Sequence, residues 1–440
     1  MSEDWMDFGR FISTFQLKLD KEFDRDGIAA SWAPSTNGAP LLWGNELNVL
    51  ELSDDALSET AEKPRAYMVL SPDGKFVAIS TNCVVRIYSV DSMSVTAEFT
   101  GHEDMVETVQ FWLYNNEDER EVQYIIFSQD SEPVGADGVI MAWHLNKEGK
   151  LVDDQETSVN FEGKFLSGDA AALSCNKNRL LHSDRSLSTQ GWDRPSDWLP
   201  QLVIRSLSDP ATEVCRLKGH QDAIKWAAWS PTDPNIVASS SWDRTCGIWN
   251  AATGESVHII QHSNGQNWTG DFSPNGEHVV LAAQNLNGTE NVAIYAVATG
   301  SCIQRLEMPN LGSWSTPLSW SPNGGVVALG IDRSVFLLDV AKNTTSEVIK
   351  VHSDGNLRDR YCSITSLKWL DRKGEKLLIR LTDHTMFIWD MKSNLKWRLQ
   401  RPSNVQELRT HWSSEVFIED KSLLLSLDGD WRVRTWEIKA

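Results

Sequence analysis

The sequence predicts an all-β fold, and three observations support this: a repeated unit, a repeated turn and a high tryptophan content. Each unit has a short apolar strand ending in an aromatic residue or Leu, a tight polar turn, a strand of small residues, and a strand of alternating apolar residues. The 440-residue chain contains 20 Trp, which is about three times the usual content. Four-stranded units that recur about every 40–45 residues are the sequence signature of a β-propeller.

The turn after the first strand is the clearest marker of the unit. It occurs as Ser71-Pro72-Asp73-Gly74, Ser273-Pro274-Asn275-Gly276 and Ser321-Pro322-Asn323-Gly324. Pro presets one turn dihedral, and Gly or Asn adopts the positive φ that a tight turn requires. Each copy therefore predicts a hairpin between the first two strands of a unit.

Nine units are predicted in this way. Their first strands end at Trp32, Leu70, Trp112, Leu173, Trp229, Phe272, Trp320, Trp369 and Phe417. Their third strands, apolar or alternating, are Leu47–Leu52, Val84–Val90, Val139–Leu145, Leu202–Leu207, Thr245–Asn250, Val292–Val297, Val335–Val340, Met386–Met391 and Val433–Ile438. We expect a single closed β-propeller of about eight or nine four-stranded blades. If one unit is an insertion or an irregular repeat, the ring has seven or eight.

The two ends of the chain predict how the ring closes. The last unit stops at its third strand, Trp431–Ile438, and so lacks an outer strand. Near the N-terminus, Phe11–Leu17 alternates like a strand. We expect this N-terminal strand to complete the last blade and remove an exposed sheet edge. The expected organisation is an N-terminal tail with the ring-closing strand (1–27), followed by the propeller (28–440).

Two further patterns resemble those of the WD-repeat family. Its dipeptides occur as Gly101-His102, Gly219-His220 and Trp389-Asp390. An Asp six residues before the third-strand Trp occurs in the pairs Asp137/Trp143, Asp243/Trp249, Asp383/Trp389 and Asp430/Trp436. Only the unit from 219 to 249 has the family's full set, which is His220, Ser239 or Ser241, Asp243 and Trp249. The resemblance implies a divergent WD-repeat propeller and says little about function.

The set of His220, Ser239, Ser241, Asp243 and Trp249 has two interpretations. Its residue types are those of a catalytic relay. The resemblance instead implies a buried hydrogen-bond network that locks the strands and loop of one blade together. In that case His220 is held by Asp243 and does not act as a base on a substrate, so we expect a structural network.

Charge and cysteine content exclude several classes of protein. With Lys+Arg 41 against Asp+Glu 61, the net charge of −20 disfavours nucleic acids and anionic membranes as partners, and no apolar run is long enough to span a membrane. The N-terminus is acidic and lacks the basic start of a secretory signal. The six Cys are dispersed without a Cys-x-x-Cys pair, which indicates a reducing compartment. We expect an intracellular protein, cytoplasmic and/or nuclear, with no metal or cofactor.

Sequence motifs of common enzymes are absent. The chain has no Gly-x-Ser-x-Gly elbow, no Gly-rich phosphate loop with Lys-Ser/Thr and no His-Glu-x-x-His. We therefore expect no catalytic residues. An enzyme whose site is assembled from distant blades in the propeller channel is the less favoured alternative.

Two loops have the composition of a protein-binding surface. The insertion 176–200 carries Trp192, Asp193, Arg194 and Trp198 together with Pro, and Trp and Arg are common anchors of interfaces. The alternative is that both Trp fold back on their own blade. The segment 353–361 carries Arg358, Arg360 and Tyr361, which could receive an acidic or phosphorylated segment; the alternative is solvated charges paired locally with Asp359.

The function expected from these observations is a non-catalytic protein–protein interaction scaffold, a subunit of a larger intracellular complex that binds other proteins. One alternative rests on a second resemblance. Trp389-Asp390-Met391-Lys392 and Trp436-Glu437-Ile438-Lys439 are similar to the box of WD-repeat substrate receptors of cullin-type ubiquitin ligases. Lys stands where Arg is commoner in that box, and Lys cannot make the bidentate pairing that Arg makes.

Overall fold

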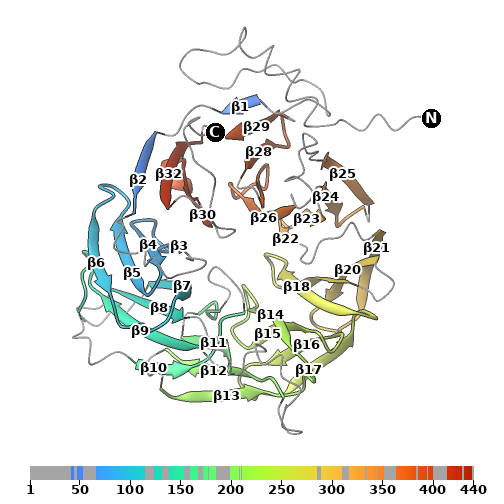
Figure 1. Cartoon of the computed structure of the whole chain (residues 1–440). Helices are drawn as coiled ribbons and strands as arrows, with labels where there is room; N and C mark the ends of the chain where they lie inside the picture. The colour runs from blue at the N-terminus through green and yellow to red at the C-terminus, as the bar shows by residue number, and fades with distance from the viewer. Residues whose placement is uncertain are drawn as a thin grey trace.

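The computed structural model describes most of the chain from residue 41 onward. The described residues are 41–43, 47–52, 66–113, 123–130, 138–152, 159–166, 172–176, 178–184, 199–207, 209, 211–284, 289–309, 317–331, 334–342, 344–350, 363–382, 385–393, 395–399, 414–428 and 431–438. These residues form eight β-sheets, which Figure 1 shows arranged like blades around a central axis. In the described part of the chain, no helix is long and apolar enough to cross a membrane.

We number the blades from 1 to 8 by chain order. Blade 1 contains β3 (Ala66–Leu70), β4 (Phe76–Thr81), β5 (Val84–Ser89) and β6 (Val95–Phe99). Blade 2 contains β7 (Val106–Leu113), β8 (Tyr124–Asp130), β9 (Val139–Leu145) and β10 (Val159–Glu162). Blade 3 contains β11 (Arg179–Ser183), β12 (Leu202–Ser206) and β13 (Glu213–Leu217). Blade 4 contains β14 (Ile224–Trp229), β15 (Ile236–Ser241), β16 (Thr245–Asn250) and β17 (Ser256–Gln261).

The second half of the ring repeats this arrangement. Blade 5 contains β18 (Gln266–Phe272), β19 (His278–Gln284), β20 (Thr289–Ala296) and β21 (Cys302–Pro309). Blade 6 contains β22 (Leu318–Trp320), β23 (Val326–Ile331), β24 (Ser334–Asp339) and β25 (Thr344–Lys350). Blade 7 contains β26 (Ile364–Trp369), β27 (Lys376–Leu381), β28 (Met386–Asp390) and β29 (Leu395–Leu399), with β1 (Leu41–Trp43) added at its edge. Blade 8 contains β30 (Ser414–Ile418), the 3-10 turn η4 (Glu419–Lys421), β31 (Leu423–Leu427), β32 (Arg432–Glu437) and β2 (Asn48–Glu51).

The all-β propeller fold is therefore confirmed, and so is its closure by a strand from the N-terminal part of the chain. The closing strand is β2, which pairs antiparallel with β32. The interpretation of Leu47–Leu52 as the third strand of a separate first unit is wrong, because this segment is the outer strand of blade 8. The misassignment arises because third strands and outer strands can both alternate apolar and polar residues. Phe11–Leu17, the segment expected in this place, lies outside the described residues, as does Trp32.

Two blades depart from the four-stranded pattern. Blade 3 has three strands, and Leu173, expected at the end of its first strand, makes only an isolated bridge to Leu180. Blade 7 has five, because β1 runs parallel to β29 with Leu41 opposite Trp397 and Trp43 opposite Leu399. The four-stranded pattern thus holds in the remaining six blades.

The predicted hairpin turn forms as its sequence requires. In the first copy, the amide of Gly74 donates to the carbonyl of Ser71 at 2.9 Å, and Gly74 has a φ of +70°. The Ser71 hydroxyl accepts the amides of Lys75 at 3.1 Å and Phe76 at 3.0 Å. A residue with a Cβ atom is strained at such a φ, which explains the Gly of the repeat.

The core lies between neighbouring blades, where the second strands are almost completely buried and the third strands add further buried side chains. Trp143, Trp249 and Trp436, each on the third strand of its blade, are among the largest fully buried side chains. Blades 1 and 2 share one apolar cluster that includes Phe76, Tyr124 and Trp143. The tryptophans of the repeat therefore supply apolar volume to the blade interfaces, where burial of such large rings contributes most to stability.

Candidate functional site

The loop residues expected to bind partners lie outside the described part of the structure. These residues are Trp192, Asp193, Arg194, Trp198, Arg358, Arg360 and Tyr361. Their role in binding stays a prediction. The structure instead describes four other groups of polar and aromatic side chains: one within blade 2, one within blade 4, and one on each of the two faces of the ring.

The five residues of the blade 4 set are linked by hydrogen bonds. His220 lies 2.8 Å from Asp243 through Nδ1 and 2.7 Å from the Ser239 hydroxyl through Nε2. The indole Nε1 of Trp249 donates to the same hydroxyl at 2.8 Å. Ser241 donates to the carbonyl of Asp222 at 2.7 Å and accepts the amide of Asp243 at 3.1 Å. The His220 side chain is buried, so in this structure its ring nitrogens are occupied by groups of its own blade.

Asp243 is the charged centre of this network. Burial alone would raise the pKa of its carboxyl, but hydrogen bonds from His220, Thr245 and the amide of Gln221 lower that pKa to about 2. The carboxylate therefore stays ionised at neutral pH and holds the loop before β14 against the turn after β15.

Blade 2 contains a second copy of the network that the sequence did not reveal. His102 lies 3.0 Å from Asp130 and 2.6 Å from the Ser128 hydroxyl, to which Trp143 Nε1 donates at 2.9 Å. The expectation of a full set in one unit only is therefore wrong. The Asp here ends β8, far from the position six residues before Trp143, whereas Asp137 at the expected spacing lies outside the described residues. In the sequence, the dipeptide Gly101-His102 is the feature that indicates a network in this unit.

One face of the ring, which we call the start face, is where the innermost strands begin. Four of these strands have a register shift after their first or second residue, which leaves one extra residue unpaired: Glu107 in β7, Lys225 in β14, Trp268 in β18 and Thr365 in β26. Such β-bulges redirect side chains and are common beside binding sites. The fold thus presents one irregular residue from each of four blades at the same end of the ring.

Three of the start-face side chains, which we call the Lys-Trp cluster, join blades 4 and 5. The Lys225 ammonium lies 4.7 Å from the ring centroid of Trp242 and 5.5 Å from that of Trp268. The two rings meet edge to face, with centroids 5.1 Å apart. Burial, and to a smaller extent the charge of Lys164, lowers the pKa of Lys225. Lys164 itself lies 3.7 Å from Glu107 of blade 2.

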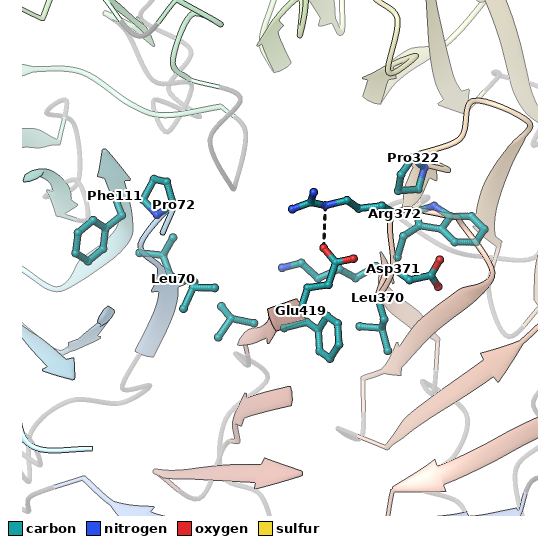
Figure 2. A pocket seen from close by; sticks show the side chains of 13 residues that line it. Leu70, Pro72, Phe111, Pro322, Leu370, Asp371, Arg372 and Glu419 are labelled. Carbon is teal, nitrogen blue, oxygen red and sulfur yellow. Dashed lines mark hydrogen bonds and ion pairs between the residues drawn. The ribbon is translucent and has the colours of Figure 1, made fainter. Parts of the chain in front are cut away.

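The opposite face of the ring, which we call the hairpin face, carries a pocket of about 390 Å³. Side chains of blades 1, 2, 6, 7 and 8 line it: Val69, Leu70, Pro72, Phe111, Pro322, Lys368, Trp369, Leu370, Asp371, Arg372, Val416, Phe417 and Glu419. Figure 2 shows Leu70, Pro72 and Phe111 on one side of the pocket and Pro322 and Arg372 on the other. Arg372 pairs with Glu419 at 3.0 Å between its Nε and the carboxylate. The pocket therefore has an apolar wall and charged groups at its rim.

Buried charges connect blades 7 and 8, two of the blades that line this pocket. Arg380 is 1% exposed and pairs with both Glu415 and Asp428, and Asp428 also pairs with Arg434 at 2.7 Å. Two cations and two anions therefore balance one another in the interior. Because a buried charge without its partner is costly, this cluster fixes the two blades that form one wall of the pocket.

The residues of the ligase-type box have local structural roles where the structure describes them. Trp389 and Trp436 are buried, and the Asp390 carboxylate accepts the amides of Lys392 at 2.9 Å and Ser393 at 3.1 Å. Lys392 is exposed, and Lys439 lies outside the described residues. Asp390 thus stabilises its own turn.

Two buried histidines are neutral at physiological pH. Burial lowers the pKa of His182 and of His262 to about 3. His182 accepts a hydrogen bond from Arg205 at 3.0 Å, and His262 lies 3.0 Å from the Tyr295 hydroxyl. Among the described residues, no three His, Cys, Asp or Glu side chains are grouped to hold a metal ion.

Comparison with known proteins agrees with this architecture. The family model "WD domain, G-beta repeat" matches residues 211–250, which include the His220 network and most of blade 4. This match and the propeller fold support the WD-repeat β-propeller family. Among solved structures, this WD-repeat protein is similar to the C-terminal WD40 domain of Sif2, with a TM-score of 0.51 at 14% identity over 73% of this chain and 79% of that chain.

Curated relatives of this WD-repeat chain match parts of it. WD repeat-containing protein AAC3 of Dictyostelium discoideum is 23% identical over 41% of this chain and 36% of its own length. THO complex subunit 3 of Arabidopsis thaliana is 23% identical over 41% of this chain and 52% of its own length. The chain therefore spans about a third to a half of the length of these two relatives.

Proposed function

We propose that this WD-repeat protein is a non-catalytic scaffold that binds other proteins as a subunit of a larger complex in the cytoplasm or nucleus. The observation that carries the proposal is the hairpin-face pocket, which five blades line together. A rigid ring that brings loops of distant blades to one place is a typical support for binding. The similarity to a protein named as a complex subunit, THO complex subunit 3, supports the same class of function.

The composition of the pocket favours a protein segment with an apolar side chain as its occupant. Leu70, Trp369 and Phe417 are half-buried and line the pocket, so an inserted apolar side chain would bury surface on all of them. Arg372 and Glu419 are exposed at the rim, where charges contribute more to selectivity than to affinity. In the proposal, Trp192, Asp193, Arg194, Trp198, Arg358, Arg360 and Tyr361 provide further contacts.

Affinity purification with quantitative mass spectrometry tests the proposal. Leu70→Asp places a charge in the pocket wall and should remove a stoichiometric set of partners that wild type retains. Val95→Asp is the matched control, because Val95 lies on the outer strand of the same blade and is 49% exposed. Thermal unfolding of both variants verifies that they remain folded. Equal partner sets for the two variants would contradict the assignment of the pocket, and turnover of a small molecule by the purified protein would contradict the non-catalytic scaffold.

A further inference from the structure

A second binding site follows from the Lys-Trp cluster on the start face, the face of the ring opposite the pocket. Lys225 and Trp268 are each the extra residue of a β-bulge, in the innermost strands of adjacent blades. Trp242 joins them from the turn after β15. All three side chains are half-buried. The cluster is therefore built by the fold, because two irregularities of register in two separate sheets bring its members into contact.

Hydrogen-bond donors in the cluster outnumber acceptors. The indole Nε1 atoms of Trp242 and Trp268 are buried and have no hydrogen-bond acceptor among the described residues. Within the same part of the chain, no carboxylate forms an ion pair with the Lys225 ammonium, whose contacts are the two indole rings. Because Lys and Trp side chains can only donate, an acceptor-only group satisfies the site, and an ionised carboxylate is such a group.

The local charge has the sign that attracts a carboxylate. Lys164 adds a second positive charge near Lys225, and its own partner, Glu107 of blade 2, lies 3.7 Å from it. The chain as a whole has a net charge of −20. A cationic spot in an acidic molecule directs a negatively charged group to one place, whereas a basic ligand would have to displace Lys225 from the two rings.

We propose that the Lys-Trp cluster binds an acidic segment of a partner protein, with an Asp or Glu carboxylate on Lys225 and the adjacent chain against the rings of Trp242 and Trp268. The site is separate from the hairpin-face pocket, so one ring can hold two partner segments at its two ends. The three side chains of the cluster include no Arg, whose planar fork is typical of phosphopeptide recognition, so the proposal commits to a carboxylate.

Selection from a library of random peptides on the full-length protein tests this inference. Peptides selected on wild type should share an Asp or Glu at a fixed position, and Lys225→Met should lose that preference while keeping the side-chain stem. A representative peptide should bind Lys225→Met at least about tenfold more weakly, and its Asp→Asn version should bind wild type with a similar loss. Lys225→Arg should retain binding, which separates the role of charge from a packing effect.

Two controls locate the site. Lys75→Met removes an exposed charge on the hairpin face and should leave the affinity of the acidic peptide unchanged. Leu70→Asp, the pocket variant, should also leave it unchanged, so failure of the two sites can be distinguished. Selected peptides without an acidic preference, unchanged binding by Lys225→Met, or stronger binding of a phosphoserine peptide than of its Glu counterpart would overturn the proposal.

Discussion

Leu50 of β2 lies directly opposite Val433 of β32, so that a strand from the N-terminal part of the chain completes the blade formed by its C-terminal part. Val433 is buried, and Leu50 packs against the apolar cluster shared by blades 8 and 1. Arg432 and Glu51 pair at 2.8 Å beside this contact. Closure of the ring therefore rests on a short strand with one inward-facing apolar residue at its centre.

Leu50→Asp should destabilise the protein, because it places a charge against the apolar cluster that holds the closing strand. We expect a loss of about 2–3 kcal/mol in the free energy of unfolding, measured by urea titration. The control is Val49→Asp, since Val49 is the neighbouring residue of the same strand and is 37% exposed; it should cost less than about 1 kcal/mol. Equal losses for the two variants would show that β2 does not close the ring.

Ser239→Ala should destabilise blade 4 far more than Ser240→Ala. Both hydroxyls are buried on β15, but that of Ser239 contacts His220 and Trp249, whereas that of Ser240 has no hydrogen-bond partner among the described residues. Ser239→Ala leaves two buried groups unsatisfied and should cost about 2–4 kcal/mol; Ser240→Ala should be neutral or slightly stabilising. Urea unfolding of the pair measures the difference, and similar values would contradict the structural role of the network.

Asp271 should make stability fall as pH rises. Its carboxylate accepts the amide of Trp320 at 2.8 Å, yet burial raises its pKa from 3.8 to about 6. The folded state therefore binds a proton more tightly than the unfolded state, and the stability that this provides at low pH is lost as pH rises from about 4 to 6. Asp271→Asn can keep the hydrogen bond and removes the titration.

Urea unfolding at several pH values measures this effect. From about pH 4.5 to 7, the stability of wild type relative to Asp271→Asn should fall by about 2 kcal/mol. Taking the difference cancels the contributions of other groups, such as the buried His182 and His262. A constant difference across this range would show that Asp271 does not titrate in it.

The buried charges between blades 7 and 8 should contribute more to the free energy of unfolding than the exposed pair at the pocket rim. Arg380→Met leaves Glu415 without its buried cation and should cost about 3–5 kcal/mol. Arg372→Ala removes the exposed partner of Glu419 and should cost less than about 1 kcal/mol. Chemical unfolding of both variants tests the contrast; a mild effect of Arg380→Met would mean that the cluster does not hold the two blades together.

Local patterns predicted the repeat well, because its strands and turns depend on nearby residues. Ser71 to Gly74 form the expected turn, and the expected third strands of seven blades are third strands in the structure. In blade 3 the expected segment, Leu202–Leu207, contains the middle strand of a three-stranded sheet. Leu47–Leu52 was misassigned because alternation does not distinguish a third strand from an outer one. Its true partner, β32, lies almost the whole chain away in sequence.

The candidate sites were harder to predict for the same physical reason. The blade 4 network follows a fixed spacing, whereas that of blade 2 uses Asp130 at a different distance from its Trp. The bulges at Lys225 and Trp268 depend on strand register, which a single sequence does not display. The pocket joins residues as distant as Leu70 and Phe417, which only ring closure brings together.

Cross-linking mass spectrometry of the native complex tests the scaffold account most directly. Lys368 lines the pocket and Lys373 is exposed in the adjacent hairpin turn, so both should cross-link to a stoichiometric partner, and these cross-links should disappear in Leu70→Asp. Lys342, exposed in the turn before the outer strand of blade 6, serves as the reference. A native protein that purifies alone, or whose cross-links to partners avoid the hairpin face, would contradict the account.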